Sequence, residues 1–100
     1  MSDCPPVVGG ARVVCFTRLD RRHRHTGNTL QLAHGQPLPP ARALVIARYD
    51  GDPQFYLFGC DETWQPCSDT CHESLEAAQE QAEFEFEGTR ATWVSVTPRD

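Results

Sequence analysis

Two apolar segments joined by a short turn constrain the fold of this chain most. The first covers residues 43–49 (ALVIARY) and the second covers residues 54–60 (QFYLFGC). Both are rich in residues that favour β-strands, and residues 50–53 between them (DGDP) combine Asp, Gly and Pro, which favour tight turns. The sequence therefore predicts a β-hairpin over residues 43–60, and the rest of the fold must be built around it.

A second pattern predicts a helix in the last third of the chain. Apolar residues recur there at spacings of three and four, and glutamates recur at the same spacings on the opposite side of the helix. The apolar positions are Leu75, Ala78, Ala82 and Phe86, and the acidic positions are Glu73, Glu76, Glu80, Glu83 and Glu87. Thr70 with Glu73 has the spacing of a capping box, and Ser74 is an alternative N-cap. Gly88 is expected to end the helix, because glycine is favoured at that position.

Three shorter segments are expected to add strands to the hairpin. Residues 12–17 alternate in the manner of a strand, with Val13 and Cys15 on one face. Residues 64–68 can return as a third strand, and their proline favours a place at the edge of the sheet. Residues 91–97 can form a last strand after the helix.

These elements predict an α+β fold. An antiparallel meander of strands packs against one main helix near the C-terminus, and a final strand follows the helix, in a β-β-β-α-β order. A single helix covers one face of such a sheet. The other face is then left to solvent or to a second copy of the chain, which makes a homodimer one option.

The length of 100 residues predicts a single domain, residues 1–100. Residues 1–10 are expected to form a loose N-terminus, and residues 19–40 a long loop rich in Arg, His and Pro. No apolar run approaches the ~18 residues of a membrane span, and the N-terminus lacks the regions of a secretion signal. Five cysteines without framework spacing fit free thiols in a reducing compartment. A cytoplasmic protein that does not enter a membrane is therefore expected.

The acidic side of the predicted helix is the first candidate binding surface. Like charges three or four residues apart each cost a helix about 0.2–0.5 kcal/mol, so an outside contribution is expected to offset them. The protein's own arginines, a basic partner, or salt and water could supply it. Phe84 falls beside the acidic side, where an aromatic group could anchor a partner or pack under the Arg-rich loop. We therefore expect a non-catalytic interaction module whose partner is a basic protein surface.

A metal- or thiol-dependent domain is an alternative function. Thiolate and imidazole groups suit tetrahedral zinc, and four such residues lie close together in the sequence. They are Cys60, Cys67, Cys71 and His72. Their spacing differs from that of paired zinc knuckles, and a cysteine is commonly a small buried apolar residue. Cys71 beside His72 near a helix start could also act as a nucleophile with a base, although such pairs usually assemble across the fold. No metal and no cofactor is therefore predicted.

The basic segment between Arg18 and His25 is the third candidate. Arginine binds phosphate through paired hydrogen bonds, and the residues that could do so here are Arg21, Arg22 and Arg24. Aromatic residues that would stack nucleic-acid bases are missing from the segment, and the chain has a net charge of −5, so nucleic acid is not the expected partner. Phosphate loops, dinucleotide fingerprints and serine elbows are also missing from the sequence, so no enzyme activity is predicted.

The C-terminal half resembles a group of short uncharacterised bacterial proteins. The segments that carry this resemblance are YLFGCD at 56–61, Trp64, DT at 69–70, SLEAA at 74–78 and QAEFEFEG at 81–88. The resemblance implies a bacterial origin and a small stand-alone domain, without an assigned activity. The expected order of three strands, a helix and a strand also looks like the partner-binding domains of some bacterial antitoxins. That likeness is topological and transfers no functional residue.

Overall fold

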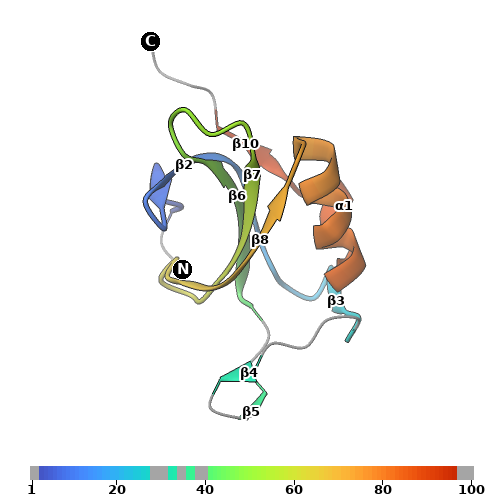
Figure 1. Cartoon of the computed structure of the whole chain (residues 1–100). Helices are drawn as coiled ribbons and strands as arrows, with labels where there is room; N and C mark the ends of the chain where they lie inside the picture. Colours follow the sequence, from blue (N-terminus) through green and yellow to red (C-terminus); the bar gives the residue numbers. More distant parts are fainter. Residues whose placement is uncertain (1–2, 28–31, 34–35, 38–40, 97–100) are drawn as a thin grey trace.

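The computed structural model describes residues 3–27, 32–33, 36–37 and 41–96. Its centre is a curled antiparallel sheet with one α-helix packed along one side and a short strand after the helix (Figure 1). The α+β prediction is confirmed. None of the helices in the described residues combines the length and the apolar character that a membrane crossing requires.

The sheet has the strand order β1-β2-β6-β7-β8, and β10 also pairs with β2. Its strands are β1 (Val7–Val8), β2 (Ala11–Arg18), β6 (Ala43–Arg48), β7 (Phe55–Cys60), β8 (Pro66–His72) and β10 (Val94–Ser95). The helix α1 (Leu75–Glu85) follows β8 directly. Smaller elements are β3 (Arg24–His25), β4 (Leu32–Ala33), β5 (Gln36–Pro37), β9 (Phe86–Glu87) and the 3-10 helix η1 (Thr89–Ala91).

The predicted hairpin is present as the pair β6 and β7. Ala43 lies opposite Cys60 and Ala47 lies opposite Tyr56, so the register is continuous from the turn to the far end. The turn residues 50–53 contain Gly51 at a φ of 80°, a conformation that glycine adopts without strain. Most of the side chains of β6 are buried, which makes the hairpin the centre of the sheet.

The helix starts later than the first expected cap. Residues up to His72 belong to β8, where Cys71 pairs with Tyr56 of β7, so Thr70 lies in a strand and does not begin a helix. The alternative cap is the correct one, since the Ser74 hydroxyl accepts a hydrogen bond of 3.0 Å from the Ala77 N–H. Pairing with β7 satisfies the backbone groups on one side of the strand along its whole length, whereas a cap satisfies one or two groups. The third strand is therefore longer than expected and lies at an edge of the sheet.

The apolar side of α1 packs on one face of the sheet, as predicted. Ala78 and Ala82 have no exposed surface, and Leu75 packs at the margin. The buried residues of this helix-side core are Cys15, Leu44, Ile46, Leu57, Ala78, Ala82 and Phe86. Small alanines on the helix let its backbone approach the sheet closely.

The opposite face of the sheet is also buried by the chain itself. Val8 of β1 and Trp64 of the turn before β8 pack in a buried cluster on this face. Its buried residues are Val8, Ala11, Val13, Ala43, Val45, Ala47, Phe58, Cys60 and Trp64. The expectation of a bare face, on which the homodimer option rested, is wrong. One helix can cover only one face of the sheet, and the curl of the sheet lets the chain bury the other face as well.

A β-bulge in β2 connects the two cores. Val13 lies opposite Ala47 but Cys15 lies opposite Ile46, so Val14 is an extra residue in the ladder. An extra residue reverses the alternation of side chains. Val13 therefore packs in one core and Cys15 in the other, where the simple alternation had placed both on one face.

Part of the N-terminal segment and part of the Arg-rich loop pair with strands of the fold. Val8 of β1 is buried against the sheet, so residues 7–8 are not part of a loose terminus. The backbone of β3 pairs with β9 directly after the helix, so residues 19–27 are not a plain loop. The rest of the expected loop contains the pair β4 and β5, and residues 28–31, 34–35 and 38–40 lie outside the described residues.

The chain leaves the helix through a tight turn at Gly88. The helix itself ends at Glu85, and Phe86 is its C-cap, so Gly88 does not have the expected role at the helix end. It lies between β9 and η1 with a φ of 100°. The last strand, β10, begins at Val94, later than the expected residue 91, because η1 extends to Ala91 and Thr92 is its C-cap. Residue 97 of the expected strand lies outside the described residues.

Candidate functional site

The exposed side of α1 presents a ridge of two carboxylates and one aromatic side chain. Glu76, Glu80 and Phe84 are four residues apart, so they lie in one row along the helix. Both glutamates are exposed, and Phe84 keeps 50 % of its surface exposed. We call these three residues the helix ridge.

The other glutamates of the predicted acidic side do not belong to this ridge. Glu73 precedes the helix cap, and Glu87 lies in β9, where it forms an ion pair with Arg24. Glu83 accepts hydrogen bonds from the backbone N–H groups of Gly88 at 3.0 Å and Arg90 at 2.9 Å. Part of the acidic charge is therefore bound within the chain, which the helical period alone did not indicate.

Glu83 holds the turn after the helix, and this predicts a pH-dependent contribution to stability. Its hydrogen bonds to the Gly88 and Arg90 N–H groups lower its pKa below the ordinary value. A carboxyl with a lowered folded-state pKa stabilises the protein above about pH 4.3, the usual pKa of glutamate, and this stabilisation is lost as the pH falls through the folded value. We expect Glu83→Gln to lower the free energy of unfolding at pH 7 by about 1 kcal/mol, by analogy with the loss of a helix cap.

Urea denaturation at pH 7 and at pH 3 measures this contribution. The difference in unfolding free energy between wild type and Glu83→Gln should shrink at the lower pH. Glu80→Gln is the matched control, because Glu80 lies one turn earlier on the same helix and is exposed. An equal loss in both variants would contradict the role of Glu83.

The basic segment folds against the end of the helix. Arg24 of β3 forms its ion pair with Glu87, and Arg22 forms one with Asp20 at 3.0 Å. That contact, together with the Arg22 backbone N–H, lowers the pKa of Asp20 to about 2. Arg21 is exposed. Two of the three arginines expected to bind phosphate, Arg22 and Arg24, therefore form ion pairs within the chain.

His23 belongs to the basic segment named from the sequence, but its burial was not predicted. Its side chain is 1 % exposed. The Nδ1 atom accepts a hydrogen bond of 3.1 Å from the Asp20 N–H, so the neutral ring carries its proton on Nε2, which lies 2.8 Å from the Thr92 Oγ1. The Thr92 hydroxyl also lies 2.7 Å from the buried Thr17 hydroxyl. This network joins the basic segment to β2 and η1.

The four weak candidates for a metal are spread over different surroundings. Cys60 is fully buried in the core, and burial raises the pKa of its thiol to about 12. Cys67 and Cys71 are exposed thiols of β8. His72 hydrogen-bonds the Thr70 hydroxyl at 2.7 Å, and burial lowers its pKa. Adjacent residues of a strand point to opposite faces, so Cys71 and His72 diverge. Among the described residues no three His, Cys, Asp or Glu side chains are grouped to hold a metal ion.

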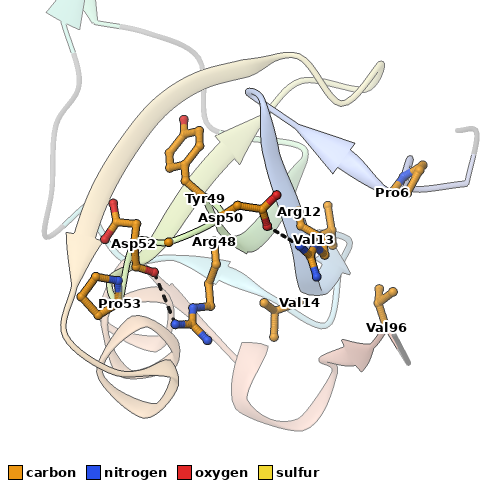
Figure 2. Close-up of a pocket in the computed structure, with 11 residues that line it drawn as sticks. Pro6, Arg12, Val13, Val14, Arg48, Tyr49, Asp50, Asp52, Pro53 and Val96 are labelled. Atoms are coloured by element: carbon orange, nitrogen blue, oxygen red, sulfur yellow. Dashed lines mark hydrogen bonds and ion pairs between the residues drawn. The ribbon is translucent and has the colours of Figure 1, made fainter. Parts of the chain in front are cut away.

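A groove of about 800 Å³ lies between the β6–β7 turn and the start of β2 (Figure 2). It has an apolar wall and two arginine side chains. Its lining comprises Pro6, Arg12, Val13, Val14, Arg48, Tyr49, Asp50, Gly51, Asp52, Pro53 and Val96. Sequence reasoning missed this groove, because it depends on the register of β2 with β6. The only local signal was the turn at residues 50–53.

We compared the chain with known protein families, curated proteins and solved structures. No family model, no curated protein and no solved structure matches the chain. The resemblance to a group of short bacterial proteins stays a prediction. The function is therefore argued below from the geometry of the described residues.

Proposed function

We propose that this protein is a non-catalytic interaction module that binds a basic protein surface through the helix ridge. The observation that carries the proposal is the arrangement of Glu76, Glu80 and Phe84 in one exposed row of α1. Glu83 and Glu87 next to this row are bound internally, whereas the ridge carboxylates face solvent. The acidic side thus divides into residues that hold the fold and residues that are available to a partner.

The chemistry of the ridge fits a partner with arginine or lysine beside an apolar recess. A half-exposed aromatic side chain contributes to an interface by filling a pocket, and carboxylates orient a basic partner and raise the association rate. The two ridge carboxylates are four residues apart and repel each other by about 0.2–0.5 kcal/mol. A basic partner would remove this repulsion.

Affinity capture from the source cell tests the proposal. The test variant is Glu76→Gln/Glu80→Gln/Phe84→Ala, and the control is Glu62→Gln/Asp69→Asn, which removes the same charge from exposed positions outside the helix ridge. We expect wild type and control to retain the same basic protein and the ridge variant to lose it. Retention by wild type should weaken as salt is raised, because exposed charges are screened.

The stability of the variants separates a binding role from a structural one. Glu76→Gln/Glu80→Gln should leave the free energy of unfolding unchanged or raise it by up to about 0.5 kcal/mol, since like-charge repulsion is relieved. Chemical denaturation measures this. Identical capture by all three proteins, or a large loss of stability in the ridge variant, would count against the proposal.

A further inference from the structure

The groove beside the β6–β7 turn is separate from the helix ridge and has a different chemistry. Arg12 and Arg48 are direct partners in the ladder of β2 and β6, so two like charges stand side by side on one face. Side chains in such positions have their Cβ atoms about 5 Å apart, and like charges there destabilise the sheet. Figure 2 shows both guanidinium groups in the groove, with Val14 between them.

These two arginines have different partners among the described residues. Arg12 forms an ion pair with Asp50 across the mouth of the groove (Figure 2). Arg48 instead donates a hydrogen bond of 3.3 Å to the backbone carbonyl of Asp52, and its guanidinium lies 4.7 Å from the centre of the Phe55 ring. The stacking and the carbonyl contact hold the Arg48 side chain in place, and the carbonyl contact uses one of the five N–H donors that a guanidinium carries.

The second carboxylate of the groove, that of Asp52, is hydrogen-bonded to residues at the start of β7. The Asp52 side chain accepts hydrogen bonds of 2.8 Å from the Gln54 N–H and from the Tyr56 hydroxyl. These two contacts lower the pKa of Asp52, and the nearby charge of Arg48 contributes less. Asp52 therefore stays ionised while its oxygens are occupied. Within the described part of the chain, Arg12 and Asp50 pair with each other and Asp52 accepts two hydrogen bonds, so Arg48 is the charged side chain of the groove best placed to meet a ligand.

The rest of the lining is apolar. Val14 forms the floor at the bulge, and Val96 keeps 37 % of its surface exposed at the edge. Pro6 and Pro53 complete the walls. A volume of about 800 Å³ lies within the range of small-molecule sites, which combine a mainly apolar surface with a few fixed polar groups.

We infer that this groove binds a carboxylate that is joined to a short aliphatic group. The carboxylate receives paired hydrogen bonds from the Arg48 guanidinium, and the aliphatic group lies against Val14 and Val96. Arginine is suited to this role because its planar fork matches a carboxylate. Two sources share this chemistry, a free short-chain carboxylic acid and the carboxyl end of a peptide with an aliphatic last residue.

Titration of the isotope-labelled protein, followed by amide NMR, tests the inference with four probes. They are hexanoate, its neutral analogue hexanamide, acetyl-Ala-Val with a free carboxyl group, and the same peptide as an amide. We expect both acids to shift the amides of Val14, Arg48 and Val96, and each acid to bind about tenfold more tightly than its amide, as charge-assisted hydrogen bonds would give. Whichever acid binds more tightly identifies the source.

Variants decide whether Arg48 is responsible. Arg48→Gln should lose the preference for the acid over the amide, whereas Arg21→Gln, which lies outside the groove, should keep it. Val96→Ser should weaken hexanoate binding while the preference for acid over amide persists. Equal binding of acid and amide, shifts confined to residues 75–85, or an unchanged preference in a folded Arg48→Gln protein would overturn the inference.

Discussion

Replacing Gly88 by alanine is expected to cost at least about 3 kcal/mol of unfolding free energy. Two effects add at this position. The backbone has a φ of 100°, where an L-residue is strained by about 1–2 kcal/mol. A Cβ atom would also lie 2.5 Å from the Arg22 carbonyl oxygen, a backbone atom that no side-chain rotation can move aside. Urea denaturation followed by circular dichroism measures the loss.

Gly51→Ala provides the matched control for this result. Gly51 has a φ of 80°, but a Cβ atom there would meet nothing within 4 Å. It should therefore lose the strain term alone, about 1–2 kcal/mol. The difference between the two variants measures how closely the turn after β9 packs on the basic segment. Equal losses would show that the Arg22 carbonyl gives way at little cost.

The second large effect is expected for His23→Ala. The ring is almost fully buried, so its removal leaves a cavity, and the Thr92 hydroxyl loses one of its hydrogen-bond partners while it keeps Thr17 and Thr89. Loss of packing together with the loss of one hydrogen bond of the network should lower the unfolding free energy by about 2–3 kcal/mol. Thermal denaturation measures the global effect, and hydrogen exchange should show faster exchange at Arg24 and Thr26.

His25→Ala is the neighbouring control. His25 stacks on Phe86 with ring centres 5.1 Å apart, but it is exposed. Its loss should cost about 0.5–1 kcal/mol, the contribution of an aromatic pair. If the two histidine variants were equally stable, the basic segment would not depend on the buried network. The segment would then be held by its backbone pairing with β9 alone.

The helical period of the sequence predicts which side of the helix a residue lies on, but it does not predict that residue's contacts with other segments. It placed Phe84 on the exposed side and Ala78 on the buried side correctly, because both depend on angles within one helix. It did not show that Glu83 would hold the next turn or that Glu87 would meet Arg24. Those contacts depend on where the chain goes after the helix and on a segment about 60 residues earlier.

The start of the helix shows the same limit. Thr70 and Ser74 both carry hydroxyl groups suited to a cap, and the sequence alone left the choice open. Ser74 is the cap because residues up to His72 pair with β7 and therefore lie in a strand. A strand pairing outweighs a single cap, and its partner lies outside any local window.

The sequence by itself determined the hairpin of β6 and β7, the amphipathic helix and the α+β class. Each follows from patterns that repeat within a few residues, namely β-favouring runs around a turn and an apolar period of 3.6. The tertiary structure alone decided the curl that buries the second sheet face, the bulge at Val14 and the pairing of β3 with β9. It also decided the groove at Arg48, since bringing Arg12 beside Arg48 requires the register of two strands about 36 residues apart. These features arise when segments distant in the sequence pack together, and patterns within a few residues do not predict such packing.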